Sequence, residues 1–424
     1  MRPKQVFSTS NCVAAILALT LLLLVSQWAY ARETVLHAFQ GRPGMLPASN
    51  LVRDAAGNLY GTTWQGGSKN CTGAFSGCGI VFKLTPTSTG WSYSVLYVFK
   101  GGHDGANPIG NLTFDATGNL YGTTQNGGNP TCFKGGGCGT VFELSPLSGG
   151  GWKERVLHVF NGSDGAGPIG GVILDSVGNL YGTTSSDSAN YGFGTVFELT
   201  PGAQGQWTET TLYAFQANIH GSDGAYPYGD LVFDKAGNLY GTTQMGGTAF
   251  NGTVFKLTYS NGSWKESILY NFSGGGDGGM PLGGLIFDTA GNLYGTTQGG
   301  GAGYGTVFEL TPSHGSWVET VLLTFTNADG AYPQGDLVFD AAGNLFGTAA
   351  NGGKAGCGPT CGSVFELTPN SGGGWTESVL YKFTGGKDGA IPLSTLLLDS
   401  AGNLYGTAFV GGNKYDGVVF KIVP

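Results

Sequence analysis

Short apolar runs alternate with Gly- and Asp-rich turns along the whole chain, and they recur in a fixed order. The clearest unit reads FDATGNLYGTT at residues 114–124, where an apolar run enters Asp-x-x-Gly-Asn and a second β-rich run leaves it. Asp at the first turn position bonds backbone N–H groups two residues on, and the Gly accepts the positive φ of a type I turn that closes on a bulge. The pattern therefore predicts a β-hairpin.

This hairpin recurs seven times, at intervals of about 52 to 61 residues. The copies begin at Asp54, Asp115, Asp175, Asp234, Asp288, Asp340 and Asp399. Self-similarity at such a period indicates a repeat architecture, in which each repeat is one supersecondary unit.

One full repeat, residues 108–160, predicts four strands. They cover residues 112–114, 119–124, 140–144 and 152–160, and Gly-rich segments separate them. Four short strands joined by turn signals indicate a four-stranded antiparallel sheet.

The first strand of each repeat is apolar at consecutive positions, as in residues 172–174 (VIL), 285–287 (LIF) and 396–398 (LLL). A sheet with one wet face would alternate, so both faces are covered. Radially stacked blades provide this cover, which predicts a β-propeller.

The number of strands predicts both the blade number and the closure. The third-strand and fourth-strand motifs each occur seven times, but the chain begins with an unpaired fourth strand at residues 35–39 and ends with an unpaired third strand at 418–423. The simplest assembly pairs these two strands in one sheet. We therefore predict an all-β fold: a seven-bladed β-propeller of four-stranded antiparallel blades, closed by the N-terminal strand completing the last blade. An open solenoid is the alternative, but it needs a capping repeat at each end, and both ends resemble interior sequence.

Residues 1–31 have the pattern of a secretory signal peptide. Arg2 and Lys4 precede an apolar run from residue 13 to 25, and residues 29–31 read Ala-Tyr-Ala. Residues 32–424 then form a single propeller domain that is secreted, extracellular or periplasmic. No second run is long enough to span a membrane, so the mature chain has no predicted span; an uncleaved anchor is the alternative.

The charge and composition of the chain restrict the classes of partner that it can bind. The net charge of −8 becomes −10 when Arg2 and Lys4 are removed, which argues against nucleic acid or an anionic membrane as partner. The chain has 80 glycines, yet 12% aromatic residues indicate an ordered protein. We expect a monomer.

Six cysteines of the mature chain form three close pairs, each in the second-to-third loop of a different repeat. We predict the disulfides Cys71–Cys78, Cys132–Cys138 and Cys357–Cys361. Zinc is the alternative, but no histidines flank the pairs and none has Cys-x-x-Cys spacing.

The second-to-third loops and the blade-to-blade connections lie on one face of the predicted propeller, and this face varies most in sequence. Binding groups are concentrated on loops held by a rigid scaffold, so we predict that the ligand binds here. The candidate residues are one aspartate of each connection except the first, the connection tyrosines and one loop tyrosine: Asp104, Asp164, Asp223, Asp277, Asp329, Asp388, Tyr226, Tyr332 and Tyr304. The alternatives are that each Asp caps its own turn and that the aromatic rings cover loop backbone. A shared Ca²⁺ has weak support, because evenly spaced blades keep the carboxylates apart.

Catalytic residues do not emerge from the repeats. His37 and His158 stand where other fourth strands carry Tyr, and we expect them to be structural. His103 and His220 lie near connection aspartates, but no Ser or Cys nucleophile motif accompanies them. We predict no catalytic residue, no metal and no cofactor.

Three motifs recur together: G-N-L-Y-G-T-T, G-T-V-F-E-L-T-P and G-G-x-D-G-A-x-P. In this respect the mature chain resembles the Gloeo/Verruco tandem-repeat family of exported bacterial proteins over nearly its whole length. The resemblance implies export and no established reaction. Members often end in a surface-anchoring tail, whereas this sequence ends on a strand at Pro424. The D-x-x-G-N-L-Y hairpin is also similar to NHL-type and streptogramin-lyase-like propellers, but it is too widespread to carry their catalytic residues across.

Two functions follow. The first is an exported, non-catalytic propeller that binds a polysaccharide or protein ligand on its loop-rich face. The second is an extracellular lyase or hydrolase with its site at the channel mouth. Chemistry requires a few unique, convergent residues, and the repeats differ chiefly in loop length, so the sequence favours binding.

Overall fold

A computed structural model describes residues 31–424 except 69–70, 72–75, 187–191, 217–222 and 354–360. In these residues the chain forms seven antiparallel blades around a central channel, which confirms the predicted fold. The signal peptide prediction falls on residues 1–31, all but the last of which lie outside the described part.

Blades 1 to 6 each use four strands in chain order, from the innermost to the outermost. Blades 1 to 3 are β3 (Val52–Arg53), β4 (Leu59–Gln65), β5 (Ile80–Thr87), β6 (Gly90–Val98); β7 (Thr113–Phe114), β8 (Leu120–Thr124), β9 (Thr140–Pro146), β10 (Trp152–Val159); and β11 (Ile173–Leu174), β12 (Leu180–Thr184), β13 (Thr195–Pro201), β14 (Trp207–Ala214). Blades 4 to 6 are β16 (Val232–Phe233), β17 (Leu239–Thr243), β19 (Thr253–Ser260), β20 (Ser263–Asn271); β21 (Ile286–Phe287), β22 (Leu293–Thr297), β23 (Thr306–Ser313), β24 (Ser316–Thr324); and β25 (Val338–Phe339), β26 (Leu345–Ala349), β27 (Ser363–Pro369), β28 (Trp375–Lys382).

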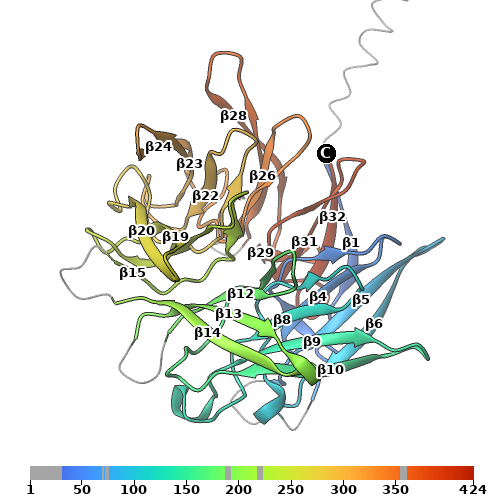
Figure 1. Cartoon of the computed structure of the whole chain (residues 1–424). Coiled ribbons are helices and arrows are strands. Elements are labelled where there is room, and N and C mark those ends of the chain that lie inside the picture. The colour runs from blue at the N-terminus through green and yellow to red at the C-terminus, as the bar shows by residue number, and fades with distance from the viewer. Residues whose placement is uncertain (1–30, 69–70, 72–75, 187–191, 217–222, 354–360) are drawn as a thin grey trace, which may run out of the picture.

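Blade 7 is built from both ends of the chain. It consists of β30 (Leu397–Leu398), β31 (Leu404–Val410), β32 (Val418–Val423) and, as its outermost strand, β1 (Arg32–Ala38). Strand β1 runs antiparallel to β32 with Val35 opposite Phe420, and the two lie side by side in Figure 1. The predicted closure is confirmed.

Short additional strands lie at the connection end of the blades: β2 (Met45–Pro47), β15 (Gly224–Ala225), β18 (Met245–Gly246) and β29 (Ala390–Pro392). The 3₁₀ turns η1 (Gly102–Asp104) and η2 (Phe133–Gly135) lie at the same end, whereas η3 (Ala203–Gly205) lies in the hairpin between β13 and β14. In the described part of the chain, no helix is long and apolar enough to cross a membrane.

The Asp-x-x-Gly-Asn hairpins form as the sequence predicts. In blade 2, Asp115 Oδ1 accepts the backbone N–H groups of Thr117 and Asn119 at 2.8 and 2.9 Å, and Gly118 takes φ +89°. The side-chain amide of Asn119 donates to the other Asp115 oxygen at 2.8 Å. Burial alone would raise the pKa of Asp115, but these hydrogen bonds outweigh it and lower that pKa.

Two phenylalanines join each blade to the next. The Phe after the outermost strand meets, edge to face, the Phe of the third strand in the following blade, as Phe160 meets Phe197 with ring centroids 5.1 Å apart. Both rings are buried. The ring of Phe197 also fills the space beside Gly182 in the second strand, where a Cβ would lie 2.7 Å from the ring. The same contact closes the molecule between Phe39, which follows β1, and Phe82 of blade 1, at 5.3 Å.

A backbone hydrogen bond repeats at every blade interface. The residue before each connection proline has positive φ and donates its N–H to the end of the previous second-to-third loop, as Tyr226 donates to the Phe193 carbonyl at 2.7 Å. Leu46 makes the equivalent bond to Asp416, from blade 1 back to blade 7, at 2.7 Å. The Gly before each third strand lies under the next proline. At Gly252, which has φ +94°, a Cβ would lie 2.4 Å from the Thr243 carbonyl oxygen and 2.6 Å from Pro281.

Two of the predicted disulfides are present: Cys71–Cys78 and Cys132–Cys138, with Cα–Cα distances of 5.4 and 4.9 Å. Of the third predicted pair, Cys361 is buried and Cys357 lies outside the described residues.

We expect Gly252→Ala to destabilise the fold by about 3 kcal/mol, because it adds a steric clash with backbone to an unfavourable φ. Gly262→Ala is the matched control. It has φ +81° in the same blade and open space around the Cβ position, so it isolates the conformational cost at about 1 kcal/mol. Urea unfolding measures both, and equal losses would contradict the clash.

A chain that begins at Phe39, without β1, is expected to melt at a lower temperature than a chain that begins at Arg32. It is also expected to associate at high concentration, because the edge of β32 is then unpaired. Thermal scans and light scattering at several concentrations test this. Equal melting temperatures with no association would show that β1 does not hold the ring closed.

Candidate functional site

The central channel holds a cavity of about 460 Å³ that receives side chains from all seven blades. This volume lies within the range of about 300 to 1,000 Å³ that is common for ligand pockets. Its polar lining consists of two carboxylates and several amides, and its aromatic lining of three rings: Asp230, Asp336, Asn50, Asn111, Gln125, Gln244, Gln298, Gln334, Trp64, Tyr228 and Phe409. These side chains are half-buried.

The lining comes from two segments of the repeat, both of which contribute in five blades, whereas blades 3 and 6 contribute only the first. One is the segment that follows the connection proline, as Tyr228 and Asp230 follow Pro227; the other is the residue after the second strand, as Gln244 follows β17. Antiparallel pairing just before the proline brings these segments together: in blade 2, Ala106 forms a bridge with Asn126, and the Gln125 N–H donates to the Asn107 carbonyl at 3.1 Å. Both lie at the end of the blades that carries the connections and the second-to-third loops. The cavity is therefore on the face that the sequence predicts for ligand binding.

A chain of hydrogen bonds runs around the channel. At five of the seven blade interfaces, the residue three positions after the connection proline donates its backbone N–H to the side chain at the same position in the next blade; at the other two, the next blade has Gly171 or Gly284 at this position. Asn50 donates to Asn111 Oδ1 at 2.8 Å, Gly171 to Asp230 Oδ1 at 2.6 Å, and Gly284 to Asp336 Oδ1 at 2.5 Å.

The same series of bonds closes the ring between the two ends of the repeat array. The backbone N–H of Asp336 donates to Thr395 Oγ1 at 2.8 Å, and the backbone N–H of Thr395 donates to Asn50 Oδ1 at 2.6 Å. Blade 3 has glycine at this position, and the Asn111 side chain reaches past it to Asp230 Oδ2 at 2.6 Å. The ring therefore fixes both carboxylates in the channel wall.

The two channel carboxylates have perturbed acidity. Burial raises the pKa of Asp230, although the hydrogen bonds from Asn111 and Gly171 oppose it. Burial also raises the pKa of Asp336, and the negative charge of Asp230 raises it further. Titratable groups with shifted pKa values in a cavity are typical of functional sites. Asp336, whose pKa is raised to about 7, is therefore a hydrogen-bond acceptor whose protonation depends on pH near neutrality.

A second cavity adjoins the first. It has a volume of about 620 Å³, lies over the loops of blades 1 and 2, and shares Trp64 and Gln125 with the channel lining. His103, Asn126 and Phe133 line its outer part. An extended ligand could therefore enter the channel at one end and lie along these loops at the other.

The connection aspartates lie at the outer strands, away from the channel cavity. They make the turn-capping bonds that the sequence left as an alternative: Asp277, for example, accepts the Ser273 N–H at 2.7 Å and the Tyr270 hydroxyl at 3.1 Å. Equivalent bonds reach Asp104, Asp164, Asp223, Asp329 and Asp388. Their role toward a ligand stays a prediction.

The three candidate tyrosines are half-buried among the loops. Tyr304 and Tyr332 contact each other with ring centroids 6.1 Å apart, and Tyr226 contacts Phe193 at 5.7 Å. None of these tyrosines lines the channel cavity. Their binding role, too, stays a prediction.

Six blades carry a glutamate in the outermost strand that lies beside the connection aspartate of the previous blade. The glutamate was not among the candidate site residues predicted from the sequence. This glutamate follows the tryptophan by two residues in five blades, as Glu266 follows Trp264, and its carboxylate lies near the connection aspartate of the previous blade. Burial, and then the charge of that aspartate, raises the pKa to about 7 in Glu33, Glu154, Glu266, Glu319 and Glu377. The W-x-E spacing could have pointed to these glutamates, but the ordinary alternation of side chains on an exposed strand produces the same spacing.

The fold and the channel define a seven-bladed β-propeller with a polar, carboxylate-bearing cavity at its centre. The profile of the Gloeobacter/Verrucomicrobia repeat matches residues 27–249, 72–301 and 232–424, so the chain belongs to that repeat family. No protein of curated function matches the chain.

The chain is similar to solved structures at low identity. The extracellular domain of a putative one-component system from B. thetaiotaomicron is 12% identical with a TM-score of 0.52, covering 93% of this chain and 40% of that one. A putative 6-phosphogluconolactonase from Bacteroides uniformis is 12% identical with a TM-score of 0.48, covering 79% and 87%. A luciferin-regenerating enzyme is 13% identical with a TM-score of 0.43, covering 93% and 96%.

The glutamate pKa values predict that stability falls as pH rises. In the unfolded chain these groups lose their protons near 4.5, and in the folded protein near 7, so between these values the folded state binds more protons. The melting temperature is therefore expected to be higher at about pH 5 than at about pH 8. The double variant Glu266→Gln/Glu319→Gln should be more stable than the wild type at pH 8 and equal to it at pH 5. An equal difference in melting temperature between the wild type and the double variant at every pH would contradict the raised pKa values of these glutamates.

Proposed function

We propose that the chain is an exported, non-catalytic propeller that binds carbohydrate in its central channel. The observation that carries the proposal is the lining of the cavity, where Trp64, Tyr228 and Phe409 lie among amides and two carboxylates. A sugar presents apolar ring faces and a rim of hydroxyl groups. Aromatic side chains can stack on the faces, and the amides and carboxylates can pair with the hydroxyls, which would otherwise be buried without partners.

Carbohydrate fits this site better than a protein surface does. The cavity is recessed between the blades, and the half-buried side chains that line it would not meet a flat partner. The adjoining second cavity gives an oligosaccharide room to continue over blades 1 and 2. The two disulfides stiffen loops on this face, which reduces the entropy lost on binding.

The channel carboxylates favour one second candidate, a glycoside hydrolase. Such enzymes use two carboxyl groups of different acidity, one of which is protonated at working pH, and the raised pKa values of Asp230 and Asp336 provide such groups. The hydrogen bonds that both carboxylates accept from neighbouring blades weigh against this role, because they hold the groups as parts of the wall.

An oligosaccharide array followed by calorimetric titration of the best-bound oligosaccharide tests the proposal. Tyr228→Ala and Gln298→Ala are expected to weaken affinity about 10- to 100-fold, which corresponds to about 1.4 to 2.7 kcal/mol. Tyr332→Ala and Asp329→Ala on the outer rim are the matched controls and should leave affinity unchanged. Loss of binding in the rim variants alone would move the site to the connection residues.

The same oligosaccharide separates binding from hydrolysis. We expect no new reducing ends after prolonged incubation with the wild type. Turnover that Asp336→Asn abolishes, while affinity is retained, would replace the binding function by the hydrolase. Binding of a protein with no glycan retained on the array would overturn the carbohydrate assignment.

A further inference from the structure

The outer strands of neighbouring blades share one polar arrangement. The fourth strand has a bulge one residue before the position that Tyr270 occupies in blade 4 and His158 in blade 2. This bulge lets the side chain at that position point toward the next blade. In blade 4 this side chain is Tyr270, whose hydroxyl donates to Asp277, and Glu319 of blade 5 lies close enough for its charge to act on Tyr270. The same position holds Tyr97, Tyr213 and Tyr381 in three other blades.

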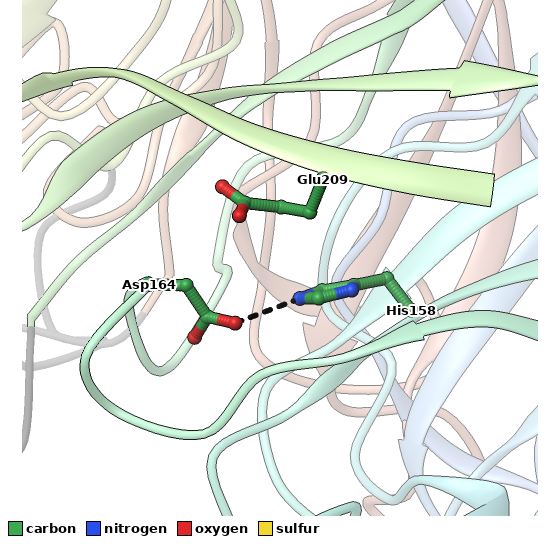
Figure 2. A group of neighbouring side chains, drawn as sticks. All are labelled: His158, Asp164 and Glu209. Atoms are coloured by element: carbon green, nitrogen blue, oxygen red, sulfur yellow. Dashed lines mark hydrogen bonds and ion pairs between the residues drawn. The ribbon is translucent and has the colours of Figure 1, made fainter.

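The interface between blades 2 and 3 departs from this arrangement. Here the position is occupied by His158 of β10, while the connection aspartate, Asp164, and the glutamate of the next blade, Glu209 of β14, are kept. An imidazole nitrogen therefore replaces a phenol oxygen beside two carboxylates. Figure 2 shows the three side chains converging from β10, the connection and β14.

The three groups are close enough to share one ion. His158 Nε2 lies 3.1 Å from Asp164 Oδ2, and one ligand atom from each of the three residues lies within 4.8 Å of the others. Bonds of about 2.0 Å in a tetrahedral site place neighbouring ligand atoms about 3.3 Å apart. The histidine and aspartate already meet this spacing, and the Glu209 carboxylate lies within 4.8 Å of both, so a bound ion requires it to move closer.

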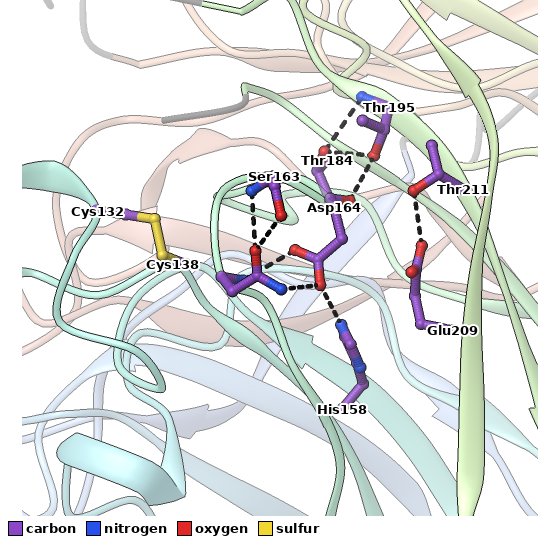
Figure 3. A network of polar contacts seen from close by, with 10 residues as sticks. Cys132, Cys138, His158, Ser163, Asp164, Thr184, Thr195, Glu209 and Thr211 are labelled. Atoms are coloured by element: carbon purple, nitrogen blue, oxygen red, sulfur yellow. Dashed lines mark hydrogen bonds and ion pairs between the residues drawn. A yellow bond between two sulfur atoms is a disulfide. The ribbon is translucent and has the colours of Figure 1, made fainter. Parts of the chain in front are cut away.

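The surrounding bonds hold the groups in place, as Figure 3 shows. The backbone N–H of Asn161 donates to Asp164 Oδ1 at 2.9 Å, and the Asn161 side chain donates to Oδ2 at 2.8 Å. Thr211 donates to Glu209 Oε1 at 3.0 Å. Such outer hydrogen bonds orient metal ligands. The His158 and Asp164 side chains keep 18% and 12% of their surface exposed, so an ion can enter from solvent.

The other histidine at this position lacks the partners. His37 of blade 7 stacks on Tyr93 of blade 1, with ring centroids 4.0 Å apart and planes inclined by 3°. Tyr93 stands where the other blades carry glutamate, and the first connection has no aspartate. In the part of the chain that the structure describes, the group at blades 2 and 3 is therefore the one set of three such ligands.

We propose that His158, Asp164 and Glu209 bind a first-row divalent transition metal of the zinc class between blades 2 and 3. One imidazole with two carboxylates is a donor set for zinc, while Ca²⁺ and Mg²⁺ require a shell made of oxygen. Three protein ligands leave a fourth position for water, and the ion ties two blades together on the outer surface of the ring.

The test uses the oxidised, full-length chain after chelator treatment and dialysis. Zn²⁺ is expected to bind in calorimetric titration and to raise the melting temperature. Co²⁺, as a zinc substitute, is expected to give the visible absorption of a bound low-symmetry ion. Mg²⁺ should neither bind in the calorimetric titration nor raise the melting temperature. Absence of Zn²⁺ binding, or an equal response to Mg²⁺ and Zn²⁺, would overturn the proposal.

His158→Tyr is the matched variant, since it restores the residue of four other blades and is expected to fold as well as the wild type. It should weaken Zn²⁺ binding at least 100-fold and abolish the cobalt absorption. Glu209→Gln keeps the side-chain volume and should weaken binding in the same direction, whereas His37→Tyr should leave it unchanged. Unchanged Zn²⁺ affinity in His158→Tyr would assign His158 to the structural role of the tyrosine.

Discussion

The contact between two phenylalanines at each blade interface is the constraint on which the rest of the structure depends. A blade supplies one ring from the end of its outermost strand, and the next blade supplies the other from its third strand, as Phe160 and Phe197 do. The second ring fits because Gly182 has no side chain beside it. No blade buries its own aromatic residues alone, so each is stable only between two neighbours. This is why the apolar first strands show no alternation and why the array has to close.

The sequence predicted the seven blades, their four strands and the closure, because these depend on local signals that repeat. Turn chemistry at the Asp-x-x-Gly-Asn hairpins and apolar periodicity are properties of a few consecutive residues. The channel was not predicted in the same detail. Asn111, Asp230 and Asp336 stand at one position of the repeat, but their meeting depends on the ring being closed. Burial in the closed channel raises the pKa of both carboxylates, and the charge of Asp230 raises that of Asp336 further.

Asymmetry is where this repeat protein carries its chemistry. At the channel position, two blades have glycine, two have asparagine, two have aspartate and one has threonine, and the hydrogen-bonded ring depends on this variation. At the outer interface between blades 2 and 3, a histidine in place of tyrosine changes a hydrogen-bond donor into the metal ligand that we propose. The connection aspartates are the opposite case: they recur in six blades and make the same capping bonds in each. Recurrence along the chain therefore identifies scaffold, and departures from it identify candidate sites.

The pairing of β1 with β32 has a consequence for how the molecule forms. These strands lie about 380 residues apart in sequence, so the first of them leaves the ribosome long before its partner exists. Six blades can assemble in order as the chain lengthens, but the seventh waits for the last residues. Until then β1 has no partner strand, and the nascent protein has an open edge that must be kept from other chains.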